Sequence, residues 1–209
     1  MNIAVLGGTF DPIHNGHLEV ASVVGECLAP CEVLFMPAGY PYLKDGYHFS
    51  AASARLEMTH LAVSGNGHWR VSSAETDRSG PTYTLDTMLA LKKGLGAFDK
   101  LYFIIGWDKL AELPRWHKPD ELIKICQLVA VPRVGVSAPD LSTIDKFLPG
   151  LSQVVVLLER PEVDISSSVI RERVKLGLPI DNFTPPAVAT YIAEKGLYKV
   201  SMHKGEGQA

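Results

Sequence analysis

Residues 2–28, NIAVLGGTFDPIHNGHLEVASVVGECL, decide the fold. Asn2 to Leu6 is a short apolar run typical of a buried strand, and Gly7 and Gly8 end it. From Gly16 to Leu28 the apolar residues recur at helical intervals. Strand, glycine turn and helix therefore follow one another, and this order is the first half of a β-α-β unit.

The same alternation continues along the chain. Strands are predicted at 32–37, 69–73, 100–105, 128–132 and 154–158. Helices are predicted at 51–62, 84–93 and 119–125. A further helical run follows the serines at 166–168 and extends to residue 176, and the last helix is predicted at 185–195. Short helical pieces are expected up to residue 113 and at 143–147, and a loop at 38–50. This pattern predicts an α/β fold, with a doubly wound, mostly parallel sheet and C-terminal helices. We expect one domain over residues 1–200 and a frayed tail at 201–209.

Composition excludes several classes of protein. Apolar residues make up 46% of the chain and charged residues 21%, which are ordinary globular values. A net charge of −3 offers no excess of cations for a large nucleic-acid footprint. No apolar run approaches the roughly 20 residues of a membrane span, and no secretory leader precedes the first strand, so we expect a cytoplasmic protein. The three cysteines are expected to be reduced thiols.

The turn after the first strand is the first candidate site, because ligands of open parallel sheets bind beyond the carboxyl ends of the strands. Gly7 and Gly8 allow close approach of the backbone to a ligand. His14 and His17 are three residues apart at a helix start and suit a phosphate chain. A turn with one capping and one packed histidine is the alternative interpretation. The sequence contains neither a P-loop nor a G-x-G-x-x-G motif, which argues against hydride transfer.

Residues 7–17, with His14-Asn15-Gly16-His17 as an H-x-G-H motif, resemble the signature of the nucleotidyltransferase superfamily. Residues 165–171, ISSSVIR, are similar to the segment that closes on the triphosphate in that superfamily. The resemblance implies the Rossmann-like nucleotidyltransferase fold. Ser166 to Ser168 can cap a helix and present N–H groups to phosphate, and Arg171 supplies a planar fork of donors. Plain helix capping is the alternative role for the serines.

Within the superfamily the chain most resembles the nicotinate-nucleotide adenylyltransferase family, from Met1 to about Tyr198. The matching segments are 53–58, 81–87, 106–108, 113–116 and 131–133, whereas Pro41-Tyr42-Leu43-Lys44 departs from the usual P-P-H-K. The resemblance implies catalytic roles for His14, His17, Lys44 and Arg171. It implies ATP binding by Gly7, Gly8, Thr9, Phe10, Gly106, Asp108, Ile165, Ser166, Ser167 and Ser168. It implies nicotinate-nucleotide binding by Lys44, Arg55, Thr82, Tyr83, Thr84, Trp116 and Arg133.

The implied reaction transfers AMP from ATP to nicotinate mononucleotide, in NAD biosynthesis. His17 is expected on the α-phosphate, His14 at the β/γ end, and Lys44 and Arg171 on the departing pyrophosphate. Mg²⁺ is expected to be carried mainly by ATP, without a metal cage of the protein. ATP and nicotinate mononucleotide are the expected partners, and neither a nucleic acid nor a membrane is expected. The sequence does not decide whether the chain forms a homo-oligomer.

Several alternatives remain at this point. The amide, nicotinamide mononucleotide, could be the main acceptor, since sequence does not fix the preference for the acid. Phosphopantetheine adenylyltransferases and cytidylyltransferases share the histidine signature, and a nucleotide sensor could bind without turnover. Taken singly, Tyr83 and Trp116 could be core aromatics, Asp108 a helix cap, and Arg55 and Lys44 solvated side chains.

Overall fold

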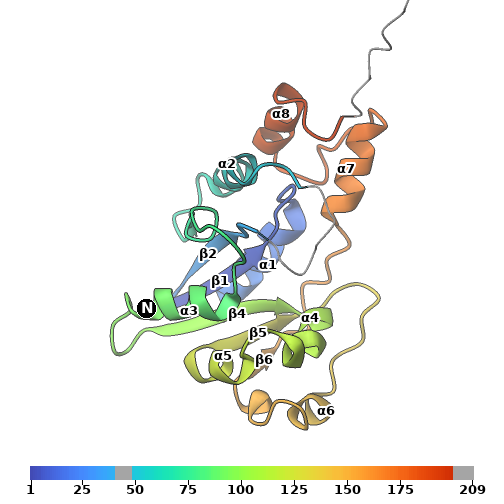
Figure 1. The fold of residues 1–209 in the computed structure, drawn as a ribbon. Coiled ribbons are helices and arrows are strands. Elements are labelled where there is room, and N and C mark those ends of the chain that lie inside the picture. Colours follow the sequence, from blue (N-terminus) through green and yellow to red (C-terminus); the bar gives the residue numbers. More distant parts are fainter. Residues whose placement is uncertain (41–48, 200–209) are drawn as a thin grey trace, which may run out of the picture.

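The computed structural model describes residues 1–40 and 49–199 (Figure 1). Two of the sequence expectations, the placement of Lys44 and the frayed tail at 201–209, lie outside the described residues. All three cysteine thiols are free. No helix in the described ranges is both long and apolar enough to cross a bilayer.

Six parallel strands form one sheet, which confirms the predicted fold class. The strands are β1 (Asn2–Gly8), β2 (Cys31–Pro37), β3 (Trp69–Val71), β4 (Lys100–Gly106), β5 (Gln127–Val131) and β6 (Val155–Leu157). Their order across the sheet is β3-β2-β1-β4-β5-β6, and every neighbouring pair is parallel. Ala4 in the central strand pairs with Val33 on one side and Tyr102 on the other, so β1 is enclosed by strands at both edges.

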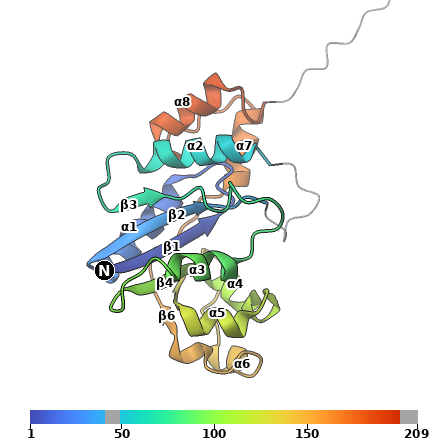
Figure 2. The ribbon, with the colours of Figure 1, turned by 60° about the vertical axis from the view of Figure 1, so that its left-hand side comes forward.

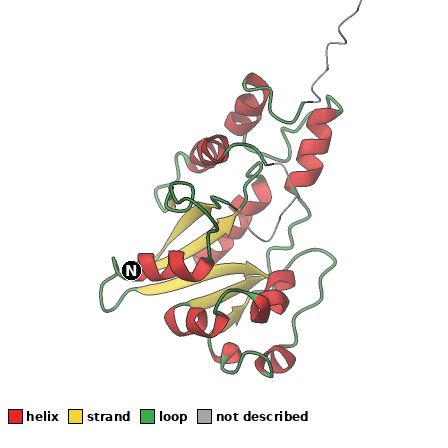
Figure 3. Ribbon diagram, in the orientation of Figure 1, coloured by secondary structure: helices red, strands yellow, loops and turns green. Residues whose placement is uncertain are grey.

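Helices cover both faces of the sheet. The α-helices are α1 (Asn15–Cys27), α2 (Ala52–Val63), α3 (Thr84–Lys92), α4 (Trp107–Glu112), α5 (Pro119–Ile125), α6 (Leu141–Asp145), α7 (Ser167–Lys175) and α8 (Pro186–Glu194). Figure 2 shows α2, α7 and α8 on one side of the sheet and α3, α5 and α6 on the other. The strands lie between these two groups (Figure 3).

The alternation of side chains along β1 divides the core between the two faces. Ala4 and Leu6 belong to a cluster that α1, α2 and α8 complete, whereas Val5 belongs to a second cluster completed by α3 and α5. All three side chains are buried. A strand with apolar residues on both faces is what a sheet covered by helices on each side requires.

The structure differs from the sequence prediction mainly at short elements. Strand β3 ends at Val71 instead of Ser73, because it pairs only with Val33–Phe35 of β2 and has no second neighbour. Helix α6 spans Leu141–Asp145, and Asp140 caps it by accepting from the backbone N–H groups of Ser142 and Thr143. Two 3₁₀ turns, at Leu113–Arg115 and Leu151–Gln153, were not predicted.

The topology fixes where a ligand can enter. The chain proceeds from β1 outward to β2 and β3, then returns to β4 on the other side of β1 and proceeds outward again. A crevice forms beyond the carboxyl ends of adjacent strands at such a reversal of strand order. Gly7 and Gly8 end β1 and Gly106 ends β4, so the glycines of both strands lie at this crevice.

Candidate active site

A cavity of about 740 Å³ opens at the carboxyl ends of β1, β4 and β5. Its volume is in the range of small-molecule sites. Twelve of the predicted site residues line it: Gly7, Thr9, His14, His17, Gly106, Asp108, Arg133, Ile165, Ser166, Ser167, Ser168 and Arg171. The structure thus brings the two motifs of the sequence, at 7–17 and 165–171, to one cavity.

A smaller cavity of about 240 Å³ lies beside α3. Thr82, Thr84 and Trp116, all predicted to bind the nicotinate nucleotide, line it together with Gly8. Gly7 and Thr9 line both cavities, so the two spaces meet at the end of β1. Two ligands bound in these spaces would approach each other at that strand end.

The two histidines of the first motif stack on each other at the start of α1. Their ring centroids are 3.6 Å apart with 24° between the ring planes. The backbone N–H of His14 donates to Nδ1 of His17 over 3.2 Å. When Nδ1 of a neutral imidazole accepts a hydrogen bond, the single ring proton is on Nε2. His17 is therefore held as an Nε2–H donor.

His14 is a neutral side chain at physiological pH. It is only 5% exposed. Burial, and to a smaller extent the charge of Arg133, lowers its pKa to about 4. Among the described residues its Nδ1 atom is buried without a hydrogen-bond partner. His14 can therefore serve a phosphate as a hydrogen-bond donor, whereas positive charge has to come from other residues.

Gly16 is required by the packing under the histidine pair. A Cβ atom at this position would lie 2.2 Å from Cγ1 of Val163 and 3.2 Å from Nδ1 of His14. Side chains are not tolerated at such distances without displacement of a neighbour. The glycine of the H-x-G-H motif thus lets the segment before α7 pack directly on the start of α1.

Helix α7 is joined to the turn after β1 by two polar contacts. Ser166 is its N-cap and accepts from the backbone N–H of Val169. Ser167 Oγ donates to the carbonyl oxygen of Pro12 over 2.8 Å, and Arg171 Nη1 donates to that of Asp11 over 2.7 Å. Ser166 therefore does cap the helix, and Arg171 keeps the rest of its guanidinium at the cavity that it lines.

Asp108 and Arg133 face each other across the larger cavity. Arg133 Nη1 lies 3.4 Å from Asp108 Oδ2, and the arginine side chain is 55% exposed. Asp108 Oδ1 lies 2.6 Å from where a Cβ of Gly106 would be, so a larger residue at the end of β4 would displace the Asp108 carboxylate. Arg133 was predicted on the nicotinate side, but the structure places it in the cavity of His14 and Arg171, because β5 ends there.

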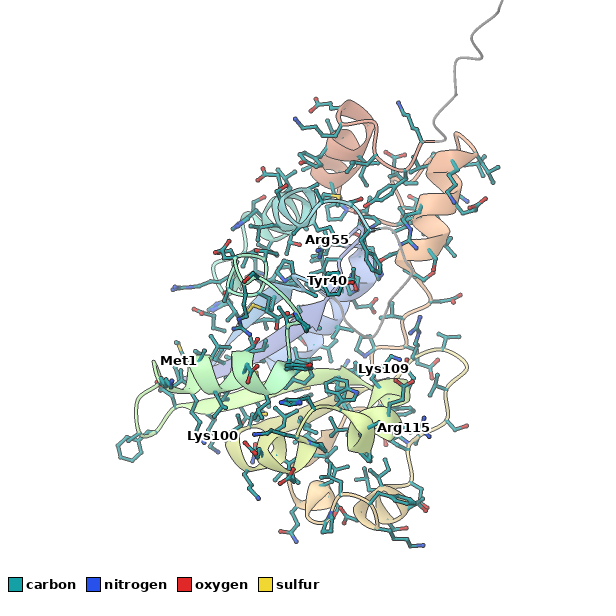
Figure 4. All side chains as sticks on the ribbon, viewed as in Figure 1. Met1, Tyr40, Arg55, Lys100, Lys109 and Arg115 are labelled. Carbon is teal, nitrogen blue, oxygen red and sulfur yellow. The ribbon has the colours of Figure 1, made fainter. Side chains whose placement is uncertain are left out.

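Arg55, predicted to bind the nicotinate nucleotide, is engaged with backbone carbonyl groups of the protein. Its side chain is 2% exposed and projects from α2 toward the sheet (Figure 4). The guanidinium donates to four backbone carbonyl oxygens, those of Thr9, Ala38, Gly39 and Ser50, over 2.6 to 3.1 Å. Arg55 lines neither cavity. Its hydrogen bonds position the turn after β1 and both ends of the 38–50 segment.

Two aromatic residues predicted to bind ligands are not part of the lining of either cavity. Phe10, predicted to bind ATP, is 2% exposed and packs edge-on against His17 and next to Phe35. Its ring occupies the space beside Gly8, where a Cβ would lie 2.6 Å away. Tyr83 stacks on His117 at 4.2 Å and lines neither cavity.

Sequence reasoning missed three polar residues of this region. Asp11 lies inside the quoted motif and is 2% exposed, yet it received no role. Tyr198 Oη donates to Asp11 Oδ1 over 2.6 Å. Glu75 lines the smaller cavity. The motif position was a signal for Asp11, whereas no local pattern marks Glu75 or Tyr198.

The donor set of the larger cavity bears on metal binding. Among residues 1–40 and 49–199, no three His, Cys, Asp or Glu side chains cluster as metal ligands do. The two carboxylates of the cavity lining are engaged, since Asp108 pairs with Arg133 and Asp11 accepts from Tyr198 and Ser50. The described lining therefore fits a divalent ion held by phosphate oxygens better than one held by side chains.

Comparison with known proteins gives concordant results. Residues 5–173 match the family model described as Cytidylyltransferase-like. A probable nicotinate-nucleotide adenylyltransferase of Dehalococcoides mccartyi strain 195 is 51% identical over 198 residues, which are 95% of this chain and 97% of the relative. One from Roseiflexus sp. strain RS-1 is 44% identical, over 94% of this chain and 98% of the relative.

A solved structure supports the fold. The nicotinic acid mononucleotide adenylyltransferase of Plasmodium falciparum, complexed with NaAD, superposes with a TM-score of 0.73 at 22% sequence identity. The match covers 94% of this chain and 97% of that one. At 22% sequence identity, this match shows that the two proteins share a fold.

Proposed function

Because the chain belongs to the cytidylyltransferase-like family and, within it, to the nicotinate-nucleotide adenylyltransferases, we propose that it transfers AMP from ATP to nicotinate mononucleotide. The products are the deamido dinucleotide and pyrophosphate. The observation that carries the proposal is the meeting of two cavities at Gly7 and Thr9, one lined by the histidine pair and Arg171 and the other by Trp116.

The reaction asks for positioning more than for activation of a nucleophile. A phosphate oxygen of the acceptor forms the new bond to the α-phosphorus, and the bond between that phosphorus and the α,β-bridging oxygen breaks. No proton has to leave the nucleophile, because the phosphate is already ionised at neutral pH. Two substrates held in adjoining cavities gain the rate advantage of proximity and orientation.

The histidines supply directed hydrogen bonds. His17, with its proton on Nε2, can donate to an α-phosphate oxygen as negative charge builds up there. The low pKa of His14, about 4, makes it a neutral donor suited to the β/γ end of the triphosphate. A neutral donor costs less to keep buried than an imidazolium ion does.

The positive charge that the pyrophosphate requires comes from arginine and lysine. Arg171 and Arg133 line the cavity, as does Lys109, which Figure 4 places on α4. We propose that Lys44 joins them from the segment outside the described residues. Mg²⁺ bound to the triphosphate would neutralise further charge on the leaving group. We further propose that the enzyme works in the cytoplasm.

The test is pyrophosphate release from ATP and Mg²⁺ with four parallel acceptors: nicotinate mononucleotide, nicotinamide mononucleotide, phosphopantetheine and none. We expect release with the acid well above release with the amide. Comparable rates with acid and amide would keep adenylyl transfer but remove the preference for the acid. Release only with phosphopantetheine would reassign the acceptor, and ATP binding without release would indicate a nucleotide sensor.

A further inference from the structure

The smaller cavity contains a single charged side chain among the described residues that line it, and this side chain is acidic. Glu75 is that residue, and the remaining lining is apolar, aromatic or hydroxyl-bearing. Glu75 takes part in none of the ion pairs formed within residues 1–40 and 49–199. A cavity with this balance of charge complements a cationic ligand.

The carboxyl group of Glu75 is held in place. Thr87 Oγ1 donates to Glu75 Oε1 over 2.8 Å. The backbone is fixed as well, because the Glu75 carbonyl oxygen would lie only 2.1 Å from a Cβ at Gly39. The 38–40 segment therefore packs directly against the backbone of Glu75. A charge that is fixed in advance loses little freedom when its partner arrives.

The described residues around Glu75 provide little positive charge to balance its carboxylate. Burial raises its pKa, while the hydrogen bond from Thr87 and the charge of Arg78 offset part of this increase. A cation bound beside the carboxylate would favour the ionised form. Binding of a cation and ionisation of Glu75 would therefore reinforce each other.

The acceptor of the proposed function has such a charge. In nicotinate mononucleotide the ring nitrogen is bonded to ribose, so the ring is a pyridinium ion, and the same is true of the amide. The indole of Trp116 lines the same cavity and packs edge-on against Phe103 at 6.0 Å. Aromatic faces attract cationic rings as well as stacking on them.

We propose that Glu75 is the counter-charge of the pyridinium ring and makes the site select N-ribosyl pyridinium nucleotides over nucleotides with a neutral ring. This inference rests on the proposed function. The preference concerns the charge of the ring, which the carboxylate and carboxamide substrates share. Glu75 acts on the ring through its charge, while Thr87 acts as a positioning residue that holds the carboxylate.

The test compares two ligands that differ in ring charge. Nicotinamide mononucleotide has a pyridinium ring, and its 1,4-dihydro form has the same carboxamide on a neutral ring. Dissociation constants for both are measured with wild type and Glu75→Gln, in addition to the KM for ATP. We expect the substitution to weaken binding of the pyridinium ligand about tenfold and that of the dihydro ligand less than about twofold, with the KM for ATP unchanged.

Control variants separate charge from structure. Glu57→Gln makes the same change on the exposed face of α2, outside both cavities, and is expected to leave both dissociation constants unchanged. Thr87→Val removes a hydroxyl but keeps the carboxylate. We expect it to weaken binding of the pyridinium ligand less than Glu75→Gln does, and to weaken binding of the dihydro ligand even less. If Glu75→Gln is unstable, Glu75→Asp replaces it, because Asp keeps the charge and should keep the selectivity.

Three outcomes would overturn the inference. These are equal weakening of both ligands by Glu75→Gln, no weakening of either, or tighter binding of the pyridinium ligand. Failure of the proposed function is distinguishable, because in that case the wild-type enzyme releases no pyrophosphate with any pyridine nucleotide. An active wild type with unchanged ring-charge selectivity in Glu75→Gln leaves the function standing and removes the role of Glu75.

Discussion

The phenol of Tyr198 donates a hydrogen bond of 2.6 Å to Oδ1 of Asp11, which lies 187 residues earlier in the chain. The second carboxylate oxygen of Asp11 accepts from the backbone N–H of Ser50, and its carbonyl oxygen accepts from Arg171. Asp11 thus joins four segments: the turn after β1, the end of the 38–50 segment, α7 and the residues after α8. Burial, and then the charge of Asp11, raises the pKa of Tyr198, so the phenol stays protonated as a donor.

Tyr198→Phe removes only the hydroxyl of this contact. We expect the free energy of unfolding to fall by about 1–3 kcal/mol, because the carboxylate of Asp11 loses a donor in a buried position. Urea unfolding measures the change. Tyr191→Phe on α8 is the matched control and should have an effect below about 0.5 kcal/mol. A double-mutant cycle with Asp11→Asn that shows no coupling energy would contradict the prediction.

His17→Ala tests the donor role of the second histidine. We expect kcat to fall by about 10²–10³, because a donor directed at developing charge is lost, while the KM for ATP changes little. Steady-state pyrophosphate release measures both constants. His60→Ala, an exposed change on α2, is the control. An unchanged kcat in His17→Ala would refute the assignment.

The low pKa of His14 predicts an acid-dependent loss of stability. Because the folded pKa, about 4, lies below the ordinary value of 6.5, the unfolded chain binds more protons between these pH values. Stability therefore decreases as the pH falls from 6.5 to 4, by up to about 3 kcal/mol from this residue. Unfolding measured at pH 7, 5 and 4 should show a smaller decrease for His14→Gln. Parallel curves for the two proteins would show that His14 does not cause the decrease.

Substitution of Arg55 should destabilise the fold more than it affects ligand contacts. Arg55→Met leaves four backbone carbonyl oxygens without their donor, and we expect a loss of at least about 3 kcal/mol. Thermal unfolding checks this. Arg70→Lys is the surface control, since Arg70 forms an exposed ion pair with Glu32 and should contribute less than about 1 kcal/mol. A stable Arg55→Met protein with a raised KM only for the acceptor would restore the substrate-binding role.

Gly16→Ala should destabilise through a single contact. The new Cβ would lie 2.2 Å from Cγ1 of Val163, and we expect a loss of about 1–3 kcal/mol. Gly25→Ala on the same helix meets its nearest neighbour, Val33, at 3.7 Å and is expected to be neutral or stabilising. Val163→Ala should recover most of the loss in the double variant. If Gly16→Ala and Gly25→Ala are equally stable, the predicted clash is absent.

Local sequence patterns were enough to predict the framework of the molecule. The apolar run of β1, its terminal glycines and the spacing of His14 and His17 each depend on residues within a few positions of one another. The same holds for the cap at Ser166, which accepts from a backbone N–H three residues later. Short elements such as β3 were less well predicted, because their length depends on the neighbouring strand.

The sequence by itself determined the alternation of strands and helices, and hence the sheet edge at which ligands bind. Only the tertiary structure decided which charged groups reach that edge. Arg55 and Arg133 were both predicted to bind the nicotinate nucleotide, yet Arg55 donates to four backbone carbonyl oxygens and Arg133 lies at the cavity beside Asp108. The physical reason is that desolvation and hydrogen bonding depend on neighbours far along the chain, as the contact between Tyr198 and Asp11 shows.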